Sequence, residues 1–467
     1  MDVALAMTAR QHTALYTHLF PGDGKEAVAV ALCGRAQHGE HHRLLVHRIH
    51  PVPYDQCERR SDQIRWKTDL IVPVLADAAR RSLAVLKIHS HPTGFPQFSG
   101  QDDRADEELF SSVYGWFDDE LPHASAIMMP DGRAIARIVM PQGAFIPMRL
   151  VSSIGDDLAL WFGDEQPLVI PEQARRDVQA FGEGTYRIVR RLRIAVIGAS
   201  GTGSLVIEEL VRSHARYLKV IDPDKVEFRN LNRILQTTVK DAEDGVAKVV
   251  CLAEAARRIG FELDIVPIVG SLHDPEVIRE VSTCDIVFGC MDTVDGRAVL
   301  NRLATFYSLP YIDVGVRLDA DGKGGIEQIC GGVHYFQPGL SSFFTRGVFT
   351  ADDVAAAAMK RTDPVEYKKR LEQKYIRGVR EDRPAVMPVN MVFAGMAVME
   401  FFARIHLYRI DSNVDFAWTE LSLSHGIYRP HPETEFRQCL TLARYVGRGD
   451  TMPLLDMPDL TELPKAA

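Results

Sequence analysis

The segment HSHPTGFPQFSGQD, from His89 to Asp102, places two histidines and a carboxylate close together in the chain. His89 and His91 are one residue apart at the end of a predicted strand, so their side chains project to the same face. Asp102 could complete a set of three ligands, which leaves the fourth position of a tetrahedral zinc for water. This pattern is typical of a hydrolytic metal site. The alternative interpretation is a polar loop with two surface histidines.

A tight loop must bring the later part of this segment back over the metal. Pro92 and Gly94 break the strand, which allows Ser99 and Asp102 to fold back toward the histidines. The spacing of the two histidines, the serine and the aspartate resembles the motif of the JAMM (JAB/MPN) metalloproteases. This resemblance covers residues 1–150 and implies an α+β domain with a mixed sheet.

The resemblance to JAMM metalloproteases implies a role for each polar residue. The implied zinc ligands are His89, His91 and Asp102. Glu26, at the head of an earlier apolar run, would be the general base on the zinc-bound water, and Ser99 would donate a hydrogen bond to the developing oxyanion. Zinc lowers the pKa of its water to about 7, and a nearby carboxylate can then take the proton. Asp103 is a rival ligand, but the spacing favours Asp102.

Length and composition indicate more than one domain and exclude some partners. The chain has 467 residues, which predicts about two to four domains. Its net charge of −9 argues against nucleic acid or an anionic membrane surface as a partner. Because no apolar run approaches roughly 18 residues and the N-terminus lacks a leader pattern, we expect a cytoplasmic protein. The seven cysteines form no CxxC pair, which fits reduced thiols.

A glycine loop near residue 200 marks the start of a second domain. The stretch RLRIAVIGASGTGSLVIEELVRSHARYLKVIDPDKVE predicts a strand, a turn, a helix and a strand. Three glycines allow the backbone to approach a phosphate at the helix N-terminus: Gly198, Gly201 and Gly203. Ser200 stands where a dinucleotide fold would have its second glycine, so the loop alone could be a simple turn. Asp222 and Asp224 follow the second strand, where an acidic side chain would meet a ribose hydroxyl.

The motifs after this loop carry a second resemblance. IDPDKVEFRNLNR, followed by GVAK and by FGCMDTVDGRAVLNR, resembles the adenylation core of ubiquitin-activating E1 enzymes and their bacterial relatives of the ThiF and MoeB type. The resemblance implies a Rossmann-like α/β domain at residues 191–467, preceded by a connector and a helix at 151–190. It also implies a site for ATP and Mg²⁺ rather than a nicotinamide site.

The same resemblance assigns roles in the ATP site. Asp222 and Asp224 would bind the ribose, and Asn232 and Arg233 would bind the phosphates. Lys248 would offset the charge of the triphosphate, and Asp292 would bind the magnesium ion. A carboxylate can attack the α-phosphate only if Arg, Lys and Mg²⁺ offset the charge that builds up. The alternative is that Arg233 and Lys248 are surface cations and that Asp292 caps a helix.

The chain departs from the adenylation family at several positions. Ile234 follows Arg233, where the family usually has glutamine. Activating enzymes that form a thioester also need a cysteine outside the nucleotide core, and none of the seven lies in a convincing exposed loop. Cys284 and Cys290 flank an apolar strand and are expected to be buried and inert. Cys330 is the remaining candidate for acyl transfer.

Two cysteine pairs that similar fused proteins usually have are largely missing. Their four positions hold Ser342, Thr345, Cys439 and Leu442. Because serine, threonine and leucine cannot rebuild a thiolate site, we predict no metal in the adenylation domain. Ser342 could accept an acyl group as an oxyester, although no activating base is evident in the sequence.

Three further segments are expected to be helical. The first contains Arg176, which by analogy with MoeB-like dimers would reach the nucleotide of a neighbouring subunit. The tract from Thr350 to Arg383 has helical spacing with solvated charges. The stretch from Pro388 to Ile405 is apolar on nearly all sides and predicts a buried helix rather than a membrane span.

Together, these motifs predict a bifunctional enzyme of a bacterial ubiquitin-like pathway. One site would use ATP and Mg²⁺ to adenylate the glycine-type C-terminus of a ubiquitin-like protein. The other, with Zn²⁺, would trim that tail or cleave its conjugates. An E2-like protein and a second copy of this chain, joined through the adenylation domain, are further expected partners. Two alternatives remain: activation of a sulfur carrier in small-molecule biosynthesis, and an adenylation fold that serves only as a binding scaffold.

Overall fold

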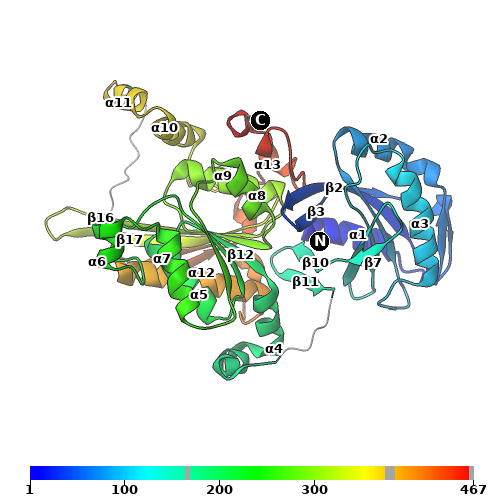
Figure 1. Ribbon diagram of the computed structural model, residues 1–467, viewed down its shortest axis with the longest axis horizontal. Helices are drawn as coiled ribbons and strands as arrows, with labels where there is room; N and C mark the ends of the chain where they lie inside the picture. The colour runs from blue at the N-terminus through cyan, green and yellow to red at the C-terminus, as the bar shows by residue number, and fades with distance from the viewer. Residues whose placement is uncertain (164–168, 374–383, 462–467) are drawn as a thin grey trace. The chain divides into compact units, whose positions relative to one another are not determined.

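The computed structural model describes residues 1–163, 169–373 and 384–461, which form two compact units (Figure 1). Unit 1 consists of Met1–Pro167 together with Phe306–Ser308 and Tyr445–Leu455. Unit 2 consists of Leu168–Thr305, Leu309–Arg444 and Asp456–Ala467. Each unit is built around one large sheet.

Unit 1 contains a nine-stranded sheet in the order β11-β10-β1-β3-β2-β6-β7-β8-β9. Its strands are β1 (Asp2–Thr8), β2 (Val28–His38), β3 (His41–Pro51), β6 (Ala84–Ser90), β7 (His123–Met128), β8 (Ala134–Val139), β9 (Phe145–Pro147), β10 (Leu150–Ile154) and β11 (Leu158–Phe162). A separate hairpin consists of β4 (Cys57–Arg59) and β5 (Ile64–Trp66). β6 runs parallel to β7 but antiparallel to β2, so the sheet is mixed, as the sequence predicted.

Helices cover both faces of this sheet (Figure 1). They are α1 (Ala9–Leu19), α2 (Val72–Arg80) and α3 (Gly100–Tyr114). In β2, Ala29 and Ala31 pack with α1, whereas Val30 and Leu32 pack with α2 and α3 on the opposite face. Successive side chains of a strand point to opposite faces, so a strand covered on both sides must be apolar throughout. This requirement explains the run AVAVALC.

Unit 1 continues beyond residue 150, where the sequence predicted the end of the first domain. β10 pairs in parallel with β1, and β11 pairs with β10, so both strands belong to one edge of the sheet. The segment 445–455 is also part of this unit, because the Gly34 amide donates to the Gly447 carbonyl. A Cβ on Gly447 would lie 2.2 Å from the Val46 carbonyl oxygen, so only glycine fits there. Such long-range pairings leave no local pattern in a sequence.

Unit 2 contains an eight-stranded sheet in the order β14-β13-β12-β15-β16-β17-β18-β19. Its strands are β12 (Arg193–Ile197), β13 (Tyr217–Ile221), β14 (Asp264–Ile268), β15 (Ile286–Gly289), β16 (Tyr311–Ala320), β17 (Ile326–Phe336), β18 (Trp418–Ser422) and β19 (Ile427–His431). The strands from β14 to β16 are parallel, and the remaining three are antiparallel. The strand order reverses between β12 and β15, which is the Rossmann-like arrangement. The predicted α/β class is therefore confirmed.

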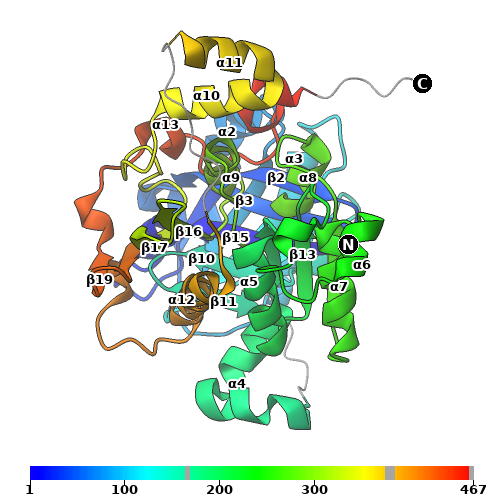
Figure 2. The ribbon, with the colours of Figure 1, turned by 90° about the vertical axis from the view of Figure 1, so that its left-hand side faces the viewer.

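The helices of unit 2 lie on both faces of its sheet. They are α4 (Arg175–Arg191), α5 (Gly201–Arg212), α6 (Val239–Asp244), α7 (Lys248–Arg258), α8 (Pro275–Ser282), α9 (Val294–Phe306), α10 (Ala351–Thr362), α11 (Pro364–Glu372), α12 (Met387–Ile405) and α13 (Leu440–Ala443). α8 and α9 lie over one face, and α5 and α12 lie over the other (Figures 1 and 2). α10 and α11 account for much of the tract expected to be helical, and its end at 374–383 lies outside the described residues.

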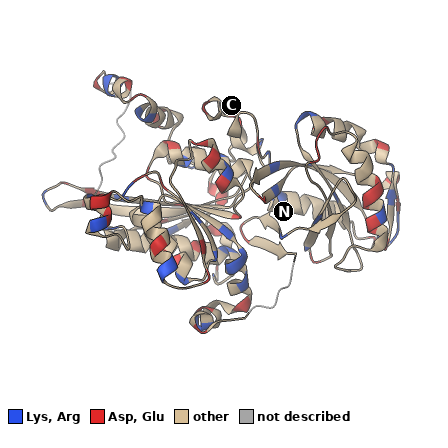
Figure 3. Ribbon diagram, viewed as in Figure 1, with Lys and Arg blue, Asp and Glu red and all other residues tan. Residues whose placement is uncertain are grey.

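The long apolar helix α12 packs against α5, β16 and β17. Among the described segments it is the one helix whose length and composition would suit a membrane span, but most of it is buried within unit 2. This position fits a core helix. Lys, Arg and Glu residues all occur along α7, whereas the charged residues of α3 are mostly Asp and Glu (Figure 3).

Candidate metal centre and nucleotide site

Three side chains of unit 1 converge at the end of β6. The Nε2 atoms of His89 and His91 lie 3.1 Å apart, and Asp102 Oδ1 lies 3.0 Å from His89 Nε2. Asp102 Oδ2 lies 3.7 Å from His91 Nε2. A tetrahedral zinc with bonds of about 2.0–2.1 Å has ligand atoms separated by about 3.3–3.4 Å. Among the described residues, this is the one group of three that could hold a metal, and its two nitrogens and one carboxylate oxygen fit zinc.

The local structure explains how these residues meet. His89 ends the buried strand β6, and His91 follows it directly. Asp102 lies in the first turn of α3, where it forms a capping box with Ser99. The Ser99 hydroxyl donates to Asp102 Oδ2 at 2.7 Å and accepts the Asp102 amide at 3.2 Å. The cap fixes the start of α3, so Asp102 faces the histidines.

The protonation states suit a cation in this position. His91 Nδ1 donates to the Phe95 carbonyl at 2.8 Å, which leaves a lone pair on the Nε2 atom that faces Asp102. Burial lowers the pKa of His89 to about 4, so this imidazole is neutral at pH 7. Burial opposes ionisation of Asp102, but hydrogen bonds from His89, His91 and Ser99 hold the pKa of this carboxyl well below its usual range. Burial opposes protonation of His91, but the hydrogen bonds with Asp102 and the Phe95 carbonyl raise the pKa of this imidazole, so a metal ion would have to displace a proton from it.

Glu26 lies beside this group. The Ser90 amide donates to the Ala27 carbonyl, and Val28 pairs with His89, so the register sets Glu26 opposite His91. Glu26 is buried, and desolvation raises the pKa of its carboxyl to about 7. Of its charged neighbours, His91 lowers this pKa and Asp102 raises it. A carboxyl with such a pKa can both accept and release a proton near neutral pH.

Two other residues of the segment have partners of their own. Asp103 Oδ1 accepts a hydrogen bond from Arg137 Nη1 at 2.5 Å, so this carboxylate faces away from the histidines. The structure thus brings Asp102 into the group and leaves Asp103 outside it. Ser99 is half-buried with its hydroxyl donated to Asp102, so the role of oxyanion donor requires that this hydroxyl turn away from the carboxylate.

In unit 2, the glycine loop lies where the strand order reverses. Gly198 follows β12 with φ +95°, a conformation that favours glycine. A Cβ on Gly203 would lie 1.8 Å from the Gly198 carbonyl oxygen, and one on Gly201 would lie 2.2 Å from Asn390 Nδ2. Gly198 and Gly203 are therefore required by the backbone around them, whereas at Gly201 the Asn390 side chain would have to move. α5 begins at Gly201, so its free amides point toward the space where a phosphate would bind.

The two aspartates after β13 have different environments. Asp222 is buried, and its carboxylate accepts the Ala199 amide at 2.7 Å and the Asp224 amide at 2.9 Å. Burial raises the pKa of Asp222, although Lys248 opposes this shift. Asp224 is exposed and pairs with Lys248 Nζ at 2.7 Å. Asp222 therefore shapes the glycine loop, whereas Asp224 is accessible to a ribose hydroxyl.

The remaining nucleotide-site residues surround the same loop. The Arg233 side chain passes Gly201, with its Cδ 3.1 Å from the Cβ position, and its Nη1 donates to Asn232 Oδ1 at 3.1 Å. Asp292 is exposed in the turn between β15 and α9. Ile234 is buried, so an apolar core side chain occupies the position where glutamine was expected.

Asn390 was missed by the sequence analysis. It is buried in the first turn of α12, and its amide lies against Gly201. A polar side chain within an otherwise apolar helix was the available signal. Arg176 is exposed on α4 and donates to Gln179 at 2.9 Å within the same helix.

The positions of the missing cysteines come together in unit 2. The Cys439 amide donates to the Leu340 carbonyl at 2.9 Å, which places the two segments side by side. Ser342 is fully buried, which argues against an acyl-ester role for its hydroxyl. An ion pair between Arg346 Nη2 and Glu433 Oε2, 2.9 Å apart, joins the same two segments, and Glu433 also accepts the Ser341 amide. The Arg346–Glu433 ion pair and the Glu433–Ser341 hydrogen bond therefore link these two segments.

Two of the cysteines are poorly placed for acyl transfer. Cys284 is buried, and Cys290 is half-buried beside the glycine loop. Burial raises the pKa of the Cys290 thiol far above its usual value, so little thiolate forms at pH 7. Cys330 is half-buried on β17.

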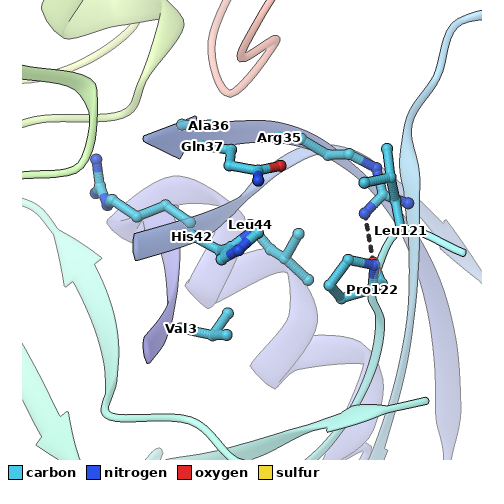
Figure 4. Close-up of a pocket in the computed structure, with 9 residues that line it drawn as sticks. Val3, Arg35, Ala36, Gln37, His42, Leu44, Leu121 and Pro122 are labelled. Carbon is cyan, nitrogen blue, oxygen red and sulfur yellow. Dashed lines mark hydrogen bonds between the residues drawn. The ribbon is translucent and has the colours of Figure 1, made fainter. Parts of the chain in front are cut away.

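Two cavities lie away from both groups of residues. The first, of about 10 Å³, lies in unit 1 beside β2 and β3, where Arg35 donates to the Pro122 carbonyl (Figure 4). It has room for about one water. The second, of about 110 Å³, lies in unit 2 with His273 and Arg361 flanking Asp295. Neither cavity is lined by a residue of the metal group or the glycine loop.

Family models match both units. The model of the ThiF family matches residues 173–440, and the model for prokaryotic homologs of the JAB domain matches residues 8–133. Among solved structures, Escherichia coli MccB with ATP is similar at 15% identity and a TM-score of 0.44, over 58% of this chain and 74% of that chain.

Several curated relatives match part of this chain. tRNA threonylcarbamoyladenosine dehydratase 2 of Saccharomyces cerevisiae is 32% identical over 152 residues, which are 32% of this chain and 33% of that protein. SUMO-activating enzyme subunit 2 of Dictyostelium discoideum is 27% identical over 30% of this chain and 21% of its own length. Ubiquitin-like modifier-activating enzyme 5 of Aedes aegypti is 25% identical over 38% of this chain and 45% of its own length.

The alignments with these three relatives therefore span less than half of each relative's length. The ThiF model, in contrast, covers more than half of this chain, and its span includes the glycine loop, Arg233 and Asp292. The JAB model covers Glu26, both histidines and Asp102. The chain therefore belongs to the ThiF family, and it carries a domain of the JAB type on the N-terminal side of its ThiF region.

Proposed function

We propose that this chain acts twice on the C-terminal tail of a ubiquitin-like protein, by adenylating its carboxylate in unit 2 and by hydrolysing peptide or isopeptide bonds in unit 1. The observation that carries the proposal is the convergence of His89, His91 and Asp102 beside Glu26 in a chain that also has a ThiF nucleotide loop. Two of the relatives are named as activating enzymes for SUMO and for a ubiquitin-like modifier, which supports a protein substrate.

In unit 1, the residues divide the work of amide hydrolysis. A zinc ion held by the three ligands would polarise the scissile carbonyl and lower the pKa of a bound water. Glu26, with its raised pKa, takes the proton from that water and delivers it to the leaving amine. Ser99 donates to the tetrahedral oxyanion once its hydroxyl leaves Asp102. Asp102 keeps its negative charge throughout.

In unit 2, the residues support nucleotidyl transfer. The substrate carboxylate oxygen bonds to the α-phosphorus of ATP, the bond to the β-phosphate breaks, and pyrophosphate leaves. Asp224 binds the ribose, and the amides at the start of α5 face the phosphates. Lys248 and Arg233 would offset the charge that builds up, and Asp292 would hold Mg²⁺. Asn390 and Arg233 both lie against Gly201.

The proposal includes partners as well as chemistry. We further propose that the substrate tail ends in glycine, as the resemblance to ubiquitin-activating enzymes implies. Burial raises the pKa of the Cys290 thiol beside the glycine loop, so we propose that the adenylate passes to an E2-like thiol, a sulfur donor or an amine supplied by another protein. We further propose that the chain forms a homodimer through unit 2, with Arg176 at the nucleotide of the neighbouring subunit. We also propose that it acts in the cytoplasm.

ATP–pyrophosphate exchange tests the adenylation step. The full chain is incubated with a glycine-ended ubiquitin-like protein, Mg²⁺, ATP and labelled pyrophosphate. We expect exchange that depends on the ubiquitin-like protein and falls about 100-fold or more in Asp292→Ala. Arg229→Ala, which changes an exposed cation near the site, should retain exchange. Binding of ATP without any exchange would favour the scaffold alternative.

A further inference from the structure

A second group of charged side chains lies buried beneath the candidate metal site in unit 1. Lys87 Nζ lies 2.6 Å from Asp106 Oδ1, and Arg137 Nη2 lies 2.7 Å from Asp106 Oδ2. Arg137 Nη1 contacts Asp103 at 2.5 Å, so two cations face two carboxylates. The Asp106 side chain has 0% exposure, and those of Lys87 and Arg137 have 6% and 8%.

This cluster joins β6 to α3, as the metal group does, but at the neighbouring position along both the strand and the helix. Lys87 and His89 are two residues apart on β6, on the face that α3 covers. Asp106 and Asp102 are four residues apart on α3 and share one face of that helix. Two residues of a strand span about 6.6 Å and four residues of a helix span about 6 Å. The contacts Lys87–Asp106 and His89–Asp102 are therefore parallel bridges between strand and helix.

Arg137 extends the cluster to a third strand and to the loop before α3. It lies on β8, and its guanidinium carbon is 3.8 Å from the centre of the Phe98 ring and 3.7 Å from that of Phe145. Phe98 immediately precedes Ser99, the residue that caps α3. Arg137 thus holds Asp106 through an ion pair and the start of the helix through a cation–π contact.

A buried cluster of charged side chains is not needed merely to fill the core, because it contributes little to stability there. Buried ion pairs are often no more stabilising than apolar side chains of the same volume, because each charge loses its hydration. The surrounding core is apolar, with Val85, Leu109 and Phe110 close by. Directional hydrogen bonds, however, fix the rotation and the height of a helix in a way that apolar contacts do not.

We propose that Asp106 is a positioning residue for the metal centre: held by Lys87 and Arg137, it sets α3 against β6 so that Asp102 reaches His89 and His91. This inference rests on the proposed metal site and extends it to residues that contact neither the metal nor the substrate. It predicts that changing Asp106 alters metal affinity and geometry without removing any ligand.

Metal titration of the full chain tests this inference. The protein is freed of metal with a chelator, and binding of Zn²⁺ is measured by competition, and that of Co²⁺ by its visible absorption. Two variants are compared with wild type: Asp106→Asn, and the charge-balanced Lys87→Met/Asp106→Leu, which keeps the volume of the core. We expect both variants to bind each metal about 10–100-fold more weakly. We also expect the Co²⁺ spectrum to lose the intensity of a tetrahedral site.

Controls separate positioning from loss of the fold. Asp131→Asn, which removes an exposed ion pair with Arg133 in the same unit, should leave metal binding unchanged. The metal-free double variant should melt within a few degrees of metal-free wild type. A folded double variant with wild-type affinity and spectrum would overturn the positioning role alone. A wild-type protein that binds neither metal would overturn the metal centre itself, and this inference with it.

Discussion

The Nε2 atoms of His89 and His91 face each other at 3.1 Å, and Asp102 closes the triangle from the first turn of α3. Nitrogen lone pairs this close repel unless a proton or a cation lies between them. The carboxylate supplies the negative charge that a divalent cation needs, and burial keeps His89 neutral by lowering its pKa. The arrangement has the dimensions of one face of a tetrahedral metal site.

Removing a ligand should abolish zinc binding, with a different structural cost for each residue. His91→Ala removes a ligand and the hydrogen bond to the Phe95 carbonyl. Asp102→Ala removes a ligand and breaks the capping box with Ser99, so its metal-free form should be about 1 kcal/mol less stable than metal-free wild type. Metal analysis of the purified variants and thermal melts of their metal-free forms measure both effects. Asp103→Asn should retain one zinc per chain; loss of zinc in that variant alone would transfer the ligand role to Asp103.

The two aspartates after β13 should give different kinetic defects. Asp224→Asn is expected to raise the KM for ATP with little change in kcat, because an exposed side chain that contacts the ribose is lost. Asp222→Asn removes the charge that holds the Ala199 amide and distorts the glycine loop, so it should lower kcat as well. Steady-state pyrophosphate exchange distinguishes the two outcomes. Identical defects in both variants would contradict this division of roles.

Glu209 makes the stability of unit 2 depend on pH. It lies half-buried on α5 against Gly395 of α12, and desolvation raises the pKa of its carboxyl from 4.5 to about 7. Because the folded state favours the protonated form, the stabilising contribution is present below about pH 4.5 and is lost as the pH rises through 7. Glu209→Gln should therefore raise stability at pH 8 by about 1–2 kcal/mol, after allowing for partial solvation.

Calorimetry of wild type and Glu209→Gln between pH 5 and 8 measures this effect. The difference between their melting temperatures should grow with pH. Glu254→Gln, at an exposed position of α7, should follow wild type at every pH. A constant difference across the range would show that the carboxyl of Glu209 does not titrate there.

The Arg346–Glu433 ion pair, which links two segments of unit 2, should contribute strongly to the stability of that unit. The Arg346 side chain has 0% exposure, so Glu433→Gln leaves a buried guanidinium without its counter-charge. Breaking a buried pair on one side costs about 3–5 kcal/mol. We expect a large fall in the melting temperature of unit 2, whereas a chelator should leave that transition unchanged. Arg370→Ala, which breaks an exposed pair on α11, serves as the control.

The sequence predicted the parts of the two sites that lie close together in the chain. The histidine motif, the glycine loop and the aspartates after β13 each form a short pattern, and the structure brings each group together. The α/β class followed from the same patterns, because a strand, a glycine turn and a helix with fixed spacing leave few alternatives.

The parts that could not be predicted depend on contacts between distant residues. Asn390 lies far from Gly201 in the sequence, and only the packing of α12 on α5 brings them together. The contact of Lys87 with Asp106 likewise needs the register between β6 and α3. Segment 445–455 joins unit 1 through backbone hydrogen bonds, which any sequence with suitably placed glycines could make.

A single reaction series tests whether both units act on one tail. A ubiquitin-like protein that ends in glycine and carries a short C-terminal extension is incubated with the zinc-loaded full chain, and ATP and Mg²⁺ are added later. Intact-mass analysis should show loss of the extension first, followed by a gain of one AMP. With this extended substrate, Glu26→Ala should block both changes, but it should still add AMP to a protein that already ends in glycine. Asp292→Ala should block only the second change. If a ubiquitin-like substrate of this chain keeps its extension and gains no AMP, the account is contradicted.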